Sequence, residues 1–151
     1  NRTVELSMLM SPEVMNFTAA HEVAHAIMHQ QSGLHRDKPL DGSSIGPRDH
    51  IELEADKFAA YFLMPAKLVS SRFNERFPPE LLQHDNLQHL LNRNKDKRVE
   101  KELSTKRGLA RALAGLDSMN GEAIFSLAEQ FKVSREAMAI RLEELKLIPE
   151  Y

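Results

Sequence analysis

The chain has 151 residues, and its hydrophobic content of 42% is ordinary for one globular domain with a sizeable core and at most a small appendage. Its 20 Lys and Arg residues nearly balance its 22 Asp and Glu residues, which leaves a formal net charge of −2 and no basic footprint for nucleic acid or an anionic membrane. The lack of Cys excludes disulfides and thiolate ligands, and no apolar segment is long enough to span a bilayer, so we expect a cytoplasmic protein with no membrane partner.

The N-terminal part predicts a short extended segment followed by a helix. Residues 3–10 alternate between apolar and polar side chains, which indicates an edge strand or a lead-in to the helix. The helix is predicted to begin at Pro12, with Ser11 as its N-cap, and to end near Gly33. Four apolar residues recur at helical spacing and form its predicted core stripe: Ala20, Val23, Ala24 and Ile27.

This helix carries an HExxH pentapeptide, which runs from His21 to His25. Two His residues four positions apart lie one turn apart on the same face, so their imidazoles can bind one Zn²⁺. Glu22 lies about 100° further around the helix, where a general base can take a proton from the attacking water. The pentapeptide alone would also fit a pair of surface histidines on an amphipathic helix, so the residues around it decide.

The pentapeptide leaves the metal one protein ligand short. Catalytic zinc sites have three protein ligands, and the chain has no Cys, so the third must be His, Asp or Glu. A third His at the spacing HExxHxxGxxH would fall at Gln31, which excludes that form of site. His29 lies too far along the helix axis to join His21 and His25, so we expect it behind the ligands or beside the substrate, with a simple polar position as the alternative.

A loop over residues 34–48, rich in Gly, Pro and Ser, leads to a second predicted helix over residues 49–64. Pro65 ends this helix and begins a third, which is predicted to run to Arg76. Three apolar residues form the predicted core side of the third helix: Leu68, Val69 and Phe73.

Acidic residues on the second helix can supply the missing ligand. Glu52 and Asp56 share one face with the small Ala59, which permits close approach to the first helix. Glu52 is therefore the predicted third ligand. Asp56, one turn further on, is predicted to accept the outer N–H of a ligand His and so fix its tautomer. Glu54 falls on roughly the opposite face, about 180–200° away, and is the fallback ligand.

The rest of the chain predicts short helices and a C-terminal helix pair. In chain order the predictions are a helix over 79–91, a charged stretch over 92–106, a helix over 109–116 and a turn at Asn120-Gly121. The last two helices, over 122–131 and 135–146, flank a tight turn with Ser134 as N-cap. This divides the chain into a metallopeptidase-like core (1–77), a charged helical linker or insertion (78–120) and a helix-turn-helix-like pair packed on the core (121–151).

These pieces, in this order, resemble the ImmA/IrrE family of zinc metallopeptidases. The resemblance rests on three stretches: Phe17 to His25 with His29 beyond it, Glu52 to Pro65, and Leu127 to Ile148. It implies a zincin-like, mainly α fold (α+β at most), with zinc held by His21, His25 and Glu52. Glu22 is then the base. The resemblance also implies that the substrate is a partner repressor of the helix-turn-helix type, whose cleavage relieves repression after stress or in mobile elements.

Two stretches depart from the family pattern. Little sequence precedes the first helix, where family members usually carry strands that edge the substrate cleft, and residues 78–120 match no part of the pattern. A rival interpretation is a regulator that binds DNA or a repressor, with a structural zinc and no proteolysis. The last predicted helix speaks against DNA binding, because its acids Glu136, Glu143 and Glu144 would repel phosphate.

Overall fold

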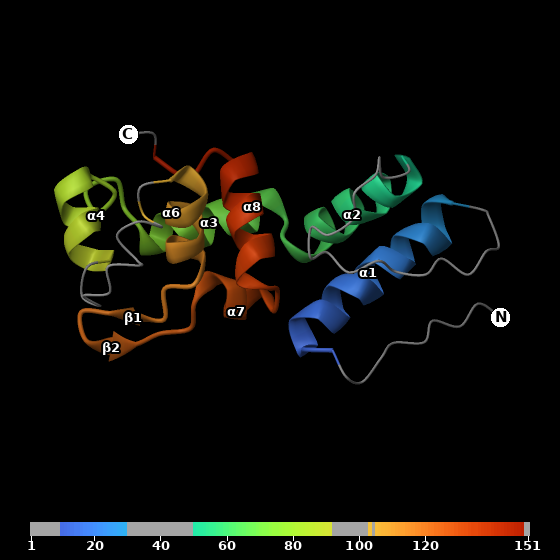
Figure 1. The fold of residues 1–151 in the computed structure, drawn as a ribbon, viewed down its shortest axis with the longest axis horizontal. Helices are drawn as coiled ribbons and strands as arrows, with labels where there is room; N and C mark the ends of the chain where they lie inside the picture. Colours follow the sequence, from blue (N-terminus) through green and yellow to red (C-terminus); the bar gives the residue numbers. More distant parts are fainter. Residues whose placement is uncertain (1–9, 30–49, 92–102, 104, 150–151) are drawn as a thin grey trace.

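The structure, a computed structural model, describes residues 10–29, 50–91, 103 and 105–149. Its elements in chain order are shown in Figure 1: α1 (Pro12–Met28), α2 (His50–Leu63), α3 (Ala66–Arg76), α4 (His84–Leu91), α6 (Lys106–Ala114), β1 (Ser118–Met119), β2 (Glu122–Ala123), α7 (Leu127–Phe131) and α8 (Arg135–Glu144). The predicted mainly α fold with a small sheet is confirmed. Across the described residues, no helix has the length and apolar character that crossing a membrane requires. The predictions for residues 3–9 and 34–48 lie outside the described residues.

The helices α1 and α2 lie against each other, and the remaining helices form a body beside this pair (Figure 1). The main hydrophobic core belongs to that body. Its largest fully buried side chains include Phe73, Phe77, Leu113, Leu127, Met138 and Leu142. The α2 end of the pair reaches this core through Leu63 and Met64, whereas the described part of α1 contributes no residue to it. Contacts other than that core must therefore hold α1 in place.

The start of α1 agrees with the prediction, and its end does not. Ser11 is extended and Pro12 occupies the first helical position, although the Ser11 side chain makes no capping hydrogen bond. The helix ends at Met28, and His29 after it is extended, with φ −117° and ψ 114°. The predicted stop at Gly33 is therefore wrong for the helix itself, and Gly33 lies outside the described residues.

The buried face of α1 is narrower than the predicted core stripe. Ala20 and Ala24 are buried as predicted, but Val23 is 42% exposed and Ile27 is 68% exposed. The helix α2 packs against the alanine side of α1, where its backbone can come closest. The predicted stripe is thus wrong for its two β-branched members, because apolar spacing alone does not reveal which side a neighbouring helix will cover.

The helix α2 ends before Pro65 and α3 follows it, as predicted. Val69 and Phe73 of α3 are buried in the core, but Leu68 is 48% exposed, so one of the three predicted core positions is wrong. The next helix, α4, begins five residues later than the predicted start at residue 79. A turn occupies these residues, in which the Leu81 backbone N–H donates to the Pro78 carbonyl oxygen at 2.9 Å.

A β-hairpin precedes the C-terminal helix pair. Its strands β1 and β2 pair antiparallel, with Ser118 opposite Ala123. The turn residues Asn120 and Gly121 have positive φ angles of 53° and 88°, as the favoured two-residue hairpin turns require. The predicted turn is confirmed. The predicted helix start at Glu122 is wrong, because Glu122 belongs to β2.

Capping side chains set where the C-terminal helices begin. The helix α7 starts at Leu127, because Ser126 and Glu129 form a capping box. The Ser126 hydroxyl accepts from the Glu129 backbone N–H at 3.2 Å, and the Glu129 carboxylate accepts from the Ser126 backbone N–H at 2.7 Å. The start of α8 is confirmed, since the Ser134 hydroxyl accepts from the Ala137 backbone N–H at 3.1 Å.

Arg141 of α8 fastens the C-terminal pair to the end of α2. Its side chain is buried, its Nε donates to the Met64 carbonyl oxygen at 3.0 Å, and its guanidinium lies 4.4 Å from the centre of the Tyr61 ring. A second link joins α1 to the turn between α7 and α8, where the Asn16 side-chain amide donates to the Lys132 carbonyl oxygen at 3.1 Å. These two polar links therefore add to the core contacts of Leu63 and Met64 in holding the α1–α2 pair against the body.

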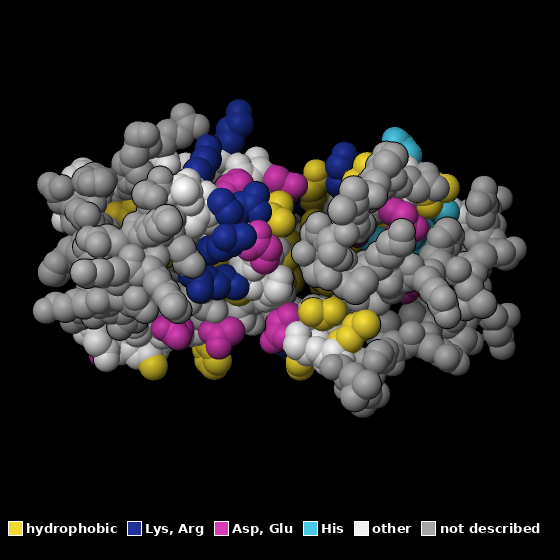
Figure 2. Space-filling model, in the orientation of Figure 1, with side chains coloured by type: hydrophobic (Ala, Val, Ile, Leu, Met, Phe, Trp, Pro, Cys, Tyr) yellow, Lys and Arg dark blue, Asp and Glu magenta, His cyan; other side chains and the backbone are white. Residues whose placement is uncertain are grey.

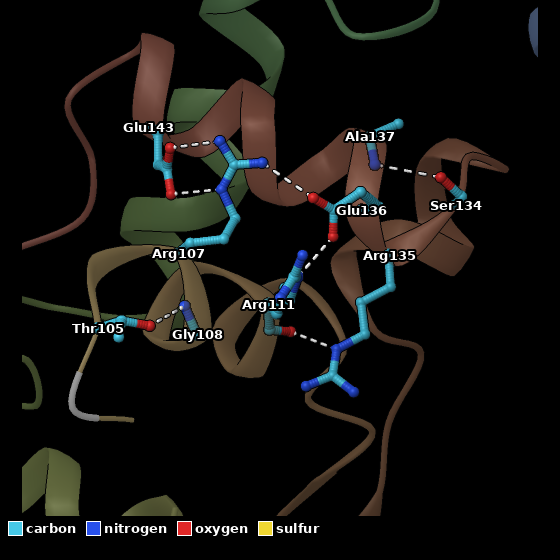
Figure 3. Close-up of polar contacts among 9 residues, drawn as sticks. All are labelled: Thr105, Arg107, Gly108, Arg111, Ser134, Arg135, Glu136, Ala137 and Glu143. Carbon is cyan, nitrogen blue, oxygen red and sulfur yellow. Dashed lines mark hydrogen bonds and ion pairs between the residues drawn. The ribbon is translucent and has the colours of Figure 1, made fainter. Parts of the chain in front are cut away.

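Ion pairs join α6 to α8 on the surface of the body (Figure 3). Arg107 donates to both carboxylate oxygens of Glu143, each at 2.8 Å, and to Glu136 at 2.9 Å. Arg111 also donates to Glu136. Figure 2 shows the result as a face on which basic and acidic side chains are interspersed. Glu136 and Glu143, two of the three acids that we expected to repel DNA phosphate, are thus paired within the molecule.

This network predicts an acid-sensitive contribution to stability. The hydrogen bond from Arg111 lowers the pKa of the Glu136 carboxyl, so the folded protein binds its proton less readily than the unfolded chain does. The resulting stability is present above the unfolded pKa and is lost as pH falls through the folded pKa. Because the Glu136 side chain is 45% exposed, solvent screening limits the contribution to under about 1 kcal/mol.

We therefore expect Glu136→Gln to lower Tm by at most about 4 °C at neutral pH. The difference from the wild type should shrink in acid, where the wild-type carboxyl is protonated as well. Thermal melts across the acid range, with the exposed Glu122→Gln as control, measure this. A difference between Glu136→Gln and wild type that stays constant down to strong acid would contradict the expectation.

Candidate metal centre

Small residues bring α1 and α2 together at the site. Ala20 and Ala24 on α1, and Ala55 and Ala59 on α2, are each at most 4% exposed. An alanine side chain is a single methyl group, so helices that meet through alanines approach closely. The larger polar side chains beside these alanines are then carried into contact with one another.

Three of those polar side chains converge on one point. The Nε2 atoms of His21 and His25 lie 2.9 Å apart, and both rings are buried. Glu52 faces both of them, with one carboxylate oxygen 3.3 Å from His21 Nε2 and the other 3.5 Å from His25 Nε2. Within the described residues, this trio is the group of His and acidic side chains whose donor atoms, all within 4.8 Å of one another, could hold a metal ion.

The spacing and chemistry of these atoms fit a zinc ion. A tetrahedral zinc with bonds of about 2.0–2.1 Å needs its ligand atoms about 3.3 Å apart. The separation of the two Nε2 atoms, and the distance from each of them to the nearer Glu52 carboxylate oxygen, lie within about half an ångström of that value. Two imidazole nitrogens and a carboxylate form the donor set that catalytic zinc sites use, and they leave a fourth position for a reactant.

Asp56 supports this trio from α2, where the sequence predicts it. Its carboxylate lies 3.0 Å from His21 Nδ1, on the side of the ring away from Glu52. A carboxylate only accepts, so Nδ1 of His21 carries the proton and Nε2 offers a lone pair. That is the tautomer a metal ligand needs. The role of Asp56 in fixing His21 stays a prediction, and its geometry is what that role requires.

Glu22 follows His21 on α1 and is half-buried. Its backbone position places it around the helix from the two histidines and apart from the trio that could bind a metal. A carboxylate there can take a proton from a reactant at the site without being a ligand itself. Its role as general base stays a prediction.

A comparison with known protein families identifies the family to which the chain belongs. The model of the peptidase M78 family, described as the IrrE N-terminal-like domain, matches residues 1–143. The chain belongs to this family. No match was found among curated proteins or among solved structures. The resemblance to ImmA/IrrE proteins is thereby confirmed, and membership of the M78 family supports an activity of the zinc metallopeptidase type.

The M78 match covers more of the chain than the three stretches that carry the resemblance. Its range, residues 1–143, includes residues 78–120. Their described part supplies core residues such as Leu109 and Leu113, and it carries Arg107, which pairs with α8. The described part of residues 78–120 therefore packs with the C-terminal helices, and the predicted division of the chain into three parts stays a prediction.

The two remaining predicted site residues, His29 and Glu54, lie together beside the trio. The Nε2 atom of His29 is 3.1 Å from a Glu54 carboxylate oxygen, and its Nδ1 is 3.1 Å from Nδ1 of His25. The hydrogen bond from His29 lowers the pKa of the Glu54 carboxyl. His50, whose side chain is 82% exposed, contacts the other oxygen of Glu54 at 3.2 Å.

The contact between His29 and Glu54 departs from the sequence analysis. On an ideal helical wheel Glu54 falls opposite Glu52, away from α1, but the structure turns it to the end of α1. Glu54 is not one of the trio that could bind a metal. The wheel misleads because it relates positions within one helix only, whereas the way α2 packs against α1 determines which α2 side chains reach His29. The sequence signal for this contact was the combination of His29, eight residues after His21, with the acidic Glu54 on the second predicted helix.

Proposed function

We propose that this protein is a zinc-dependent endopeptidase that cleaves a repressor of the helix-turn-helix type. The observation that carries the proposal is the convergence of His21, His25 and Glu52 at zinc-binding distances in a member of the peptidase M78 family. Zinc at this site would supply a Lewis acid that polarises a scissile carbonyl and makes a water molecule more acidic.

The side chains around the site have distinct tasks in this reaction. Glu22 accepts the proton of the attacking water and then gives it to the leaving amine. The two imidazoles and Glu52 would hold the metal. Asp56 keeps His21 in the tautomer that presents Nε2, so this nitrogen needs no reorganisation during turnover.

The resemblance to the ImmA/IrrE family supports a repressor as the substrate. The C-terminal helices and α6 beside them offer little to DNA directly: Arg141 is buried against α2, and Arg107 of α6 is occupied by Glu136 and Glu143. We therefore expect the protein to act on the repressor and not on its operator.

Co-expression with a candidate helix-turn-helix repressor tests the proposal. We expect a shortened repressor, with a single new terminus that mass spectrometry can locate, and no shortening with Glu22→Gln. An intact repressor bound to the protein would instead mean a stoichiometric antirepressor. A salt-dependent shift of operator DNA by this protein alone would favour the DNA-binding regulator.

A further inference from the structure

Three histidines follow one another along the end of α1, each one turn after the last, and α2 faces each of them with an acid. His21 contacts Asp56 directly through its outer nitrogen, Nδ1. The outer nitrogen of His25, also Nδ1, lies 3.1 Å from Nδ1 of His29, which in turn contacts Glu54 through Nε2. The two histidines of the trio are therefore supported in different ways.

The contact between Glu54 and His29 determines which ring nitrogen carries the proton in His29 and then in His25. The Glu54 carboxylate only accepts, so His29 donates to it from Nε2. A neutral His29 then has its lone pair on Nδ1 and accepts from His25 Nδ1. His25 is thereby left with its own lone pair on Nε2, the atom that faces His21 and Glu52. Each step assigns one tautomer, and together they prepare His25 to bind a cation.

The backbone also fixes His29 at this position. Its N–H donates to the His25 carbonyl oxygen at 3.1 Å, although its own φ and ψ angles are extended. Its side chain is only 11% exposed. A surface histidine without a task would be free to turn outward, whereas this ring is held at both nitrogens and at its backbone.

We propose that His29 and Glu54 are positioning residues that hold His25, through an imidazole–carboxylate relay, in the orientation and tautomer that bind the metal. The inference rests on the proposed zinc site and goes beyond it, because it gives His25 a support that reaches the protein surface. Glu54 acts only through His29. The relay should therefore behave as one unit when its members are removed.

Metal affinity is the direct measurement, made by competition with a chromogenic zinc chelator on the full chain. Loss of a partner behind a ligand histidine lowers metal affinity by about 10- to 100-fold, and we expect this for His29→Ala. His29→Asn should restore most of the affinity, because its side-chain oxygen can accept from His25 Nδ1. Glu54→Ala should weaken zinc binding, and Glu54→Gln less so, since the amide oxygen still accepts from His29.

His50→Gln is the matched control. His50 touches the same carboxylate as His29 but is 82% exposed and does not contact His25, so its replacement should leave zinc affinity unchanged. The double variant His29→Ala/Glu54→Ala should bind zinc no more weakly than His29→Ala alone, because Glu54 has no effect once its intermediary is gone. Nitrogen-15 NMR of the His25 ring should show a single tautomer in the wild type and a mixture in His29→Ala.

Three outcomes would overturn the relay. These are wild-type affinity in His29→Ala, equal losses in His29→Asn and His29→Ala, or additive losses in the double variant. The first two would leave the proposed peptidase intact, because the wild type would still bind zinc and cleave its substrate. A wild-type chain that binds no zinc would overturn the relay and the proposed function together.

Discussion

Replacing Glu22 with Gln is expected to abolish peptide cleavage while zinc remains bound. Glutamine has nearly the same size and can still hydrogen-bond, but it cannot accept a proton at neutral pH. Loss of general-base catalysis typically lowers the rate by about 10²- to 10⁴-fold, and we expect kcat/KM for repressor cleavage to fall by that amount. Zinc content, measured by elemental analysis, should stay at the wild-type level because Glu22 is outside the trio that could bind a metal.

Glu13→Gln is the matched control for this experiment. Glu13 lies in the first turn of the same helix, far along the axis from the histidines, so its replacement should leave cleavage unchanged. Cleavage by Glu22→Gln within a few-fold of the wild type would refute the proposed mechanism. Loss of zinc together with activity would instead assign Glu22 a part in holding the metal.

Removing the metal is expected to loosen α1 more than any other described helix. The described part of α1 gives no residue to the hydrophobic core, and its buried contact with α2 consists of alanines, histidines and acids. Metal bound by both helices adds stability according to its affinity, about 4 kcal/mol when its free concentration is a thousand times Kd. Chelation removes that term and leaves His21, His25 and Glu52 crowded together without their shared partner.

Hydrogen exchange measures this effect helix by helix. Amides of α1 near His21 should exchange much faster after chelation, whereas those of α6 and α8, in the core of the body, should hardly change. His21→Ala should exchange like the chelated wild type even when zinc is present, and Glu22→Gln should not. Equal protection of α1 with and without metal would show that the alanine contacts and the Asn16 link suffice on their own.

The parts of the site that follow from local spacing are predictable from the sequence. His21 and His25 are one helical turn apart whatever surrounds them, and Glu52 and Asp56 follow from the same rule on the second helix. Pro12, Pro65 and Ser134 fix helix boundaries through backbone chemistry that is equally local. These predictions about shape hold because they need no knowledge of how the helices pack.

The parts that depend on packing are not predictable in this way. The exposure of Val23 and Ile27 follows from the side that α2 covers, and apolar periodicity does not specify that side. The contact between His29 and Glu54 joins the residue after α1 to α2, so it depends on how these two helices pack. The buried position of Arg141, which binds the Met64 carbonyl oxygen 77 residues earlier in the chain, depends on the tertiary fold. Long-range contacts decide each of these features.

The alanines between α1 and α2 make the chemistry of this site vulnerable to changes of shape alone. Ala24, Ala55 and Ala59 are completely inaccessible to solvent, so a larger side chain at any of them would wedge the helices apart. Every metal-binding atom would still be present in such a protein, but Glu52 would stand too far from the imidazoles. A single valine at one of these positions could thus inactivate the protein as fully as the loss of a ligand, and a search for inactive variants would recover both kinds.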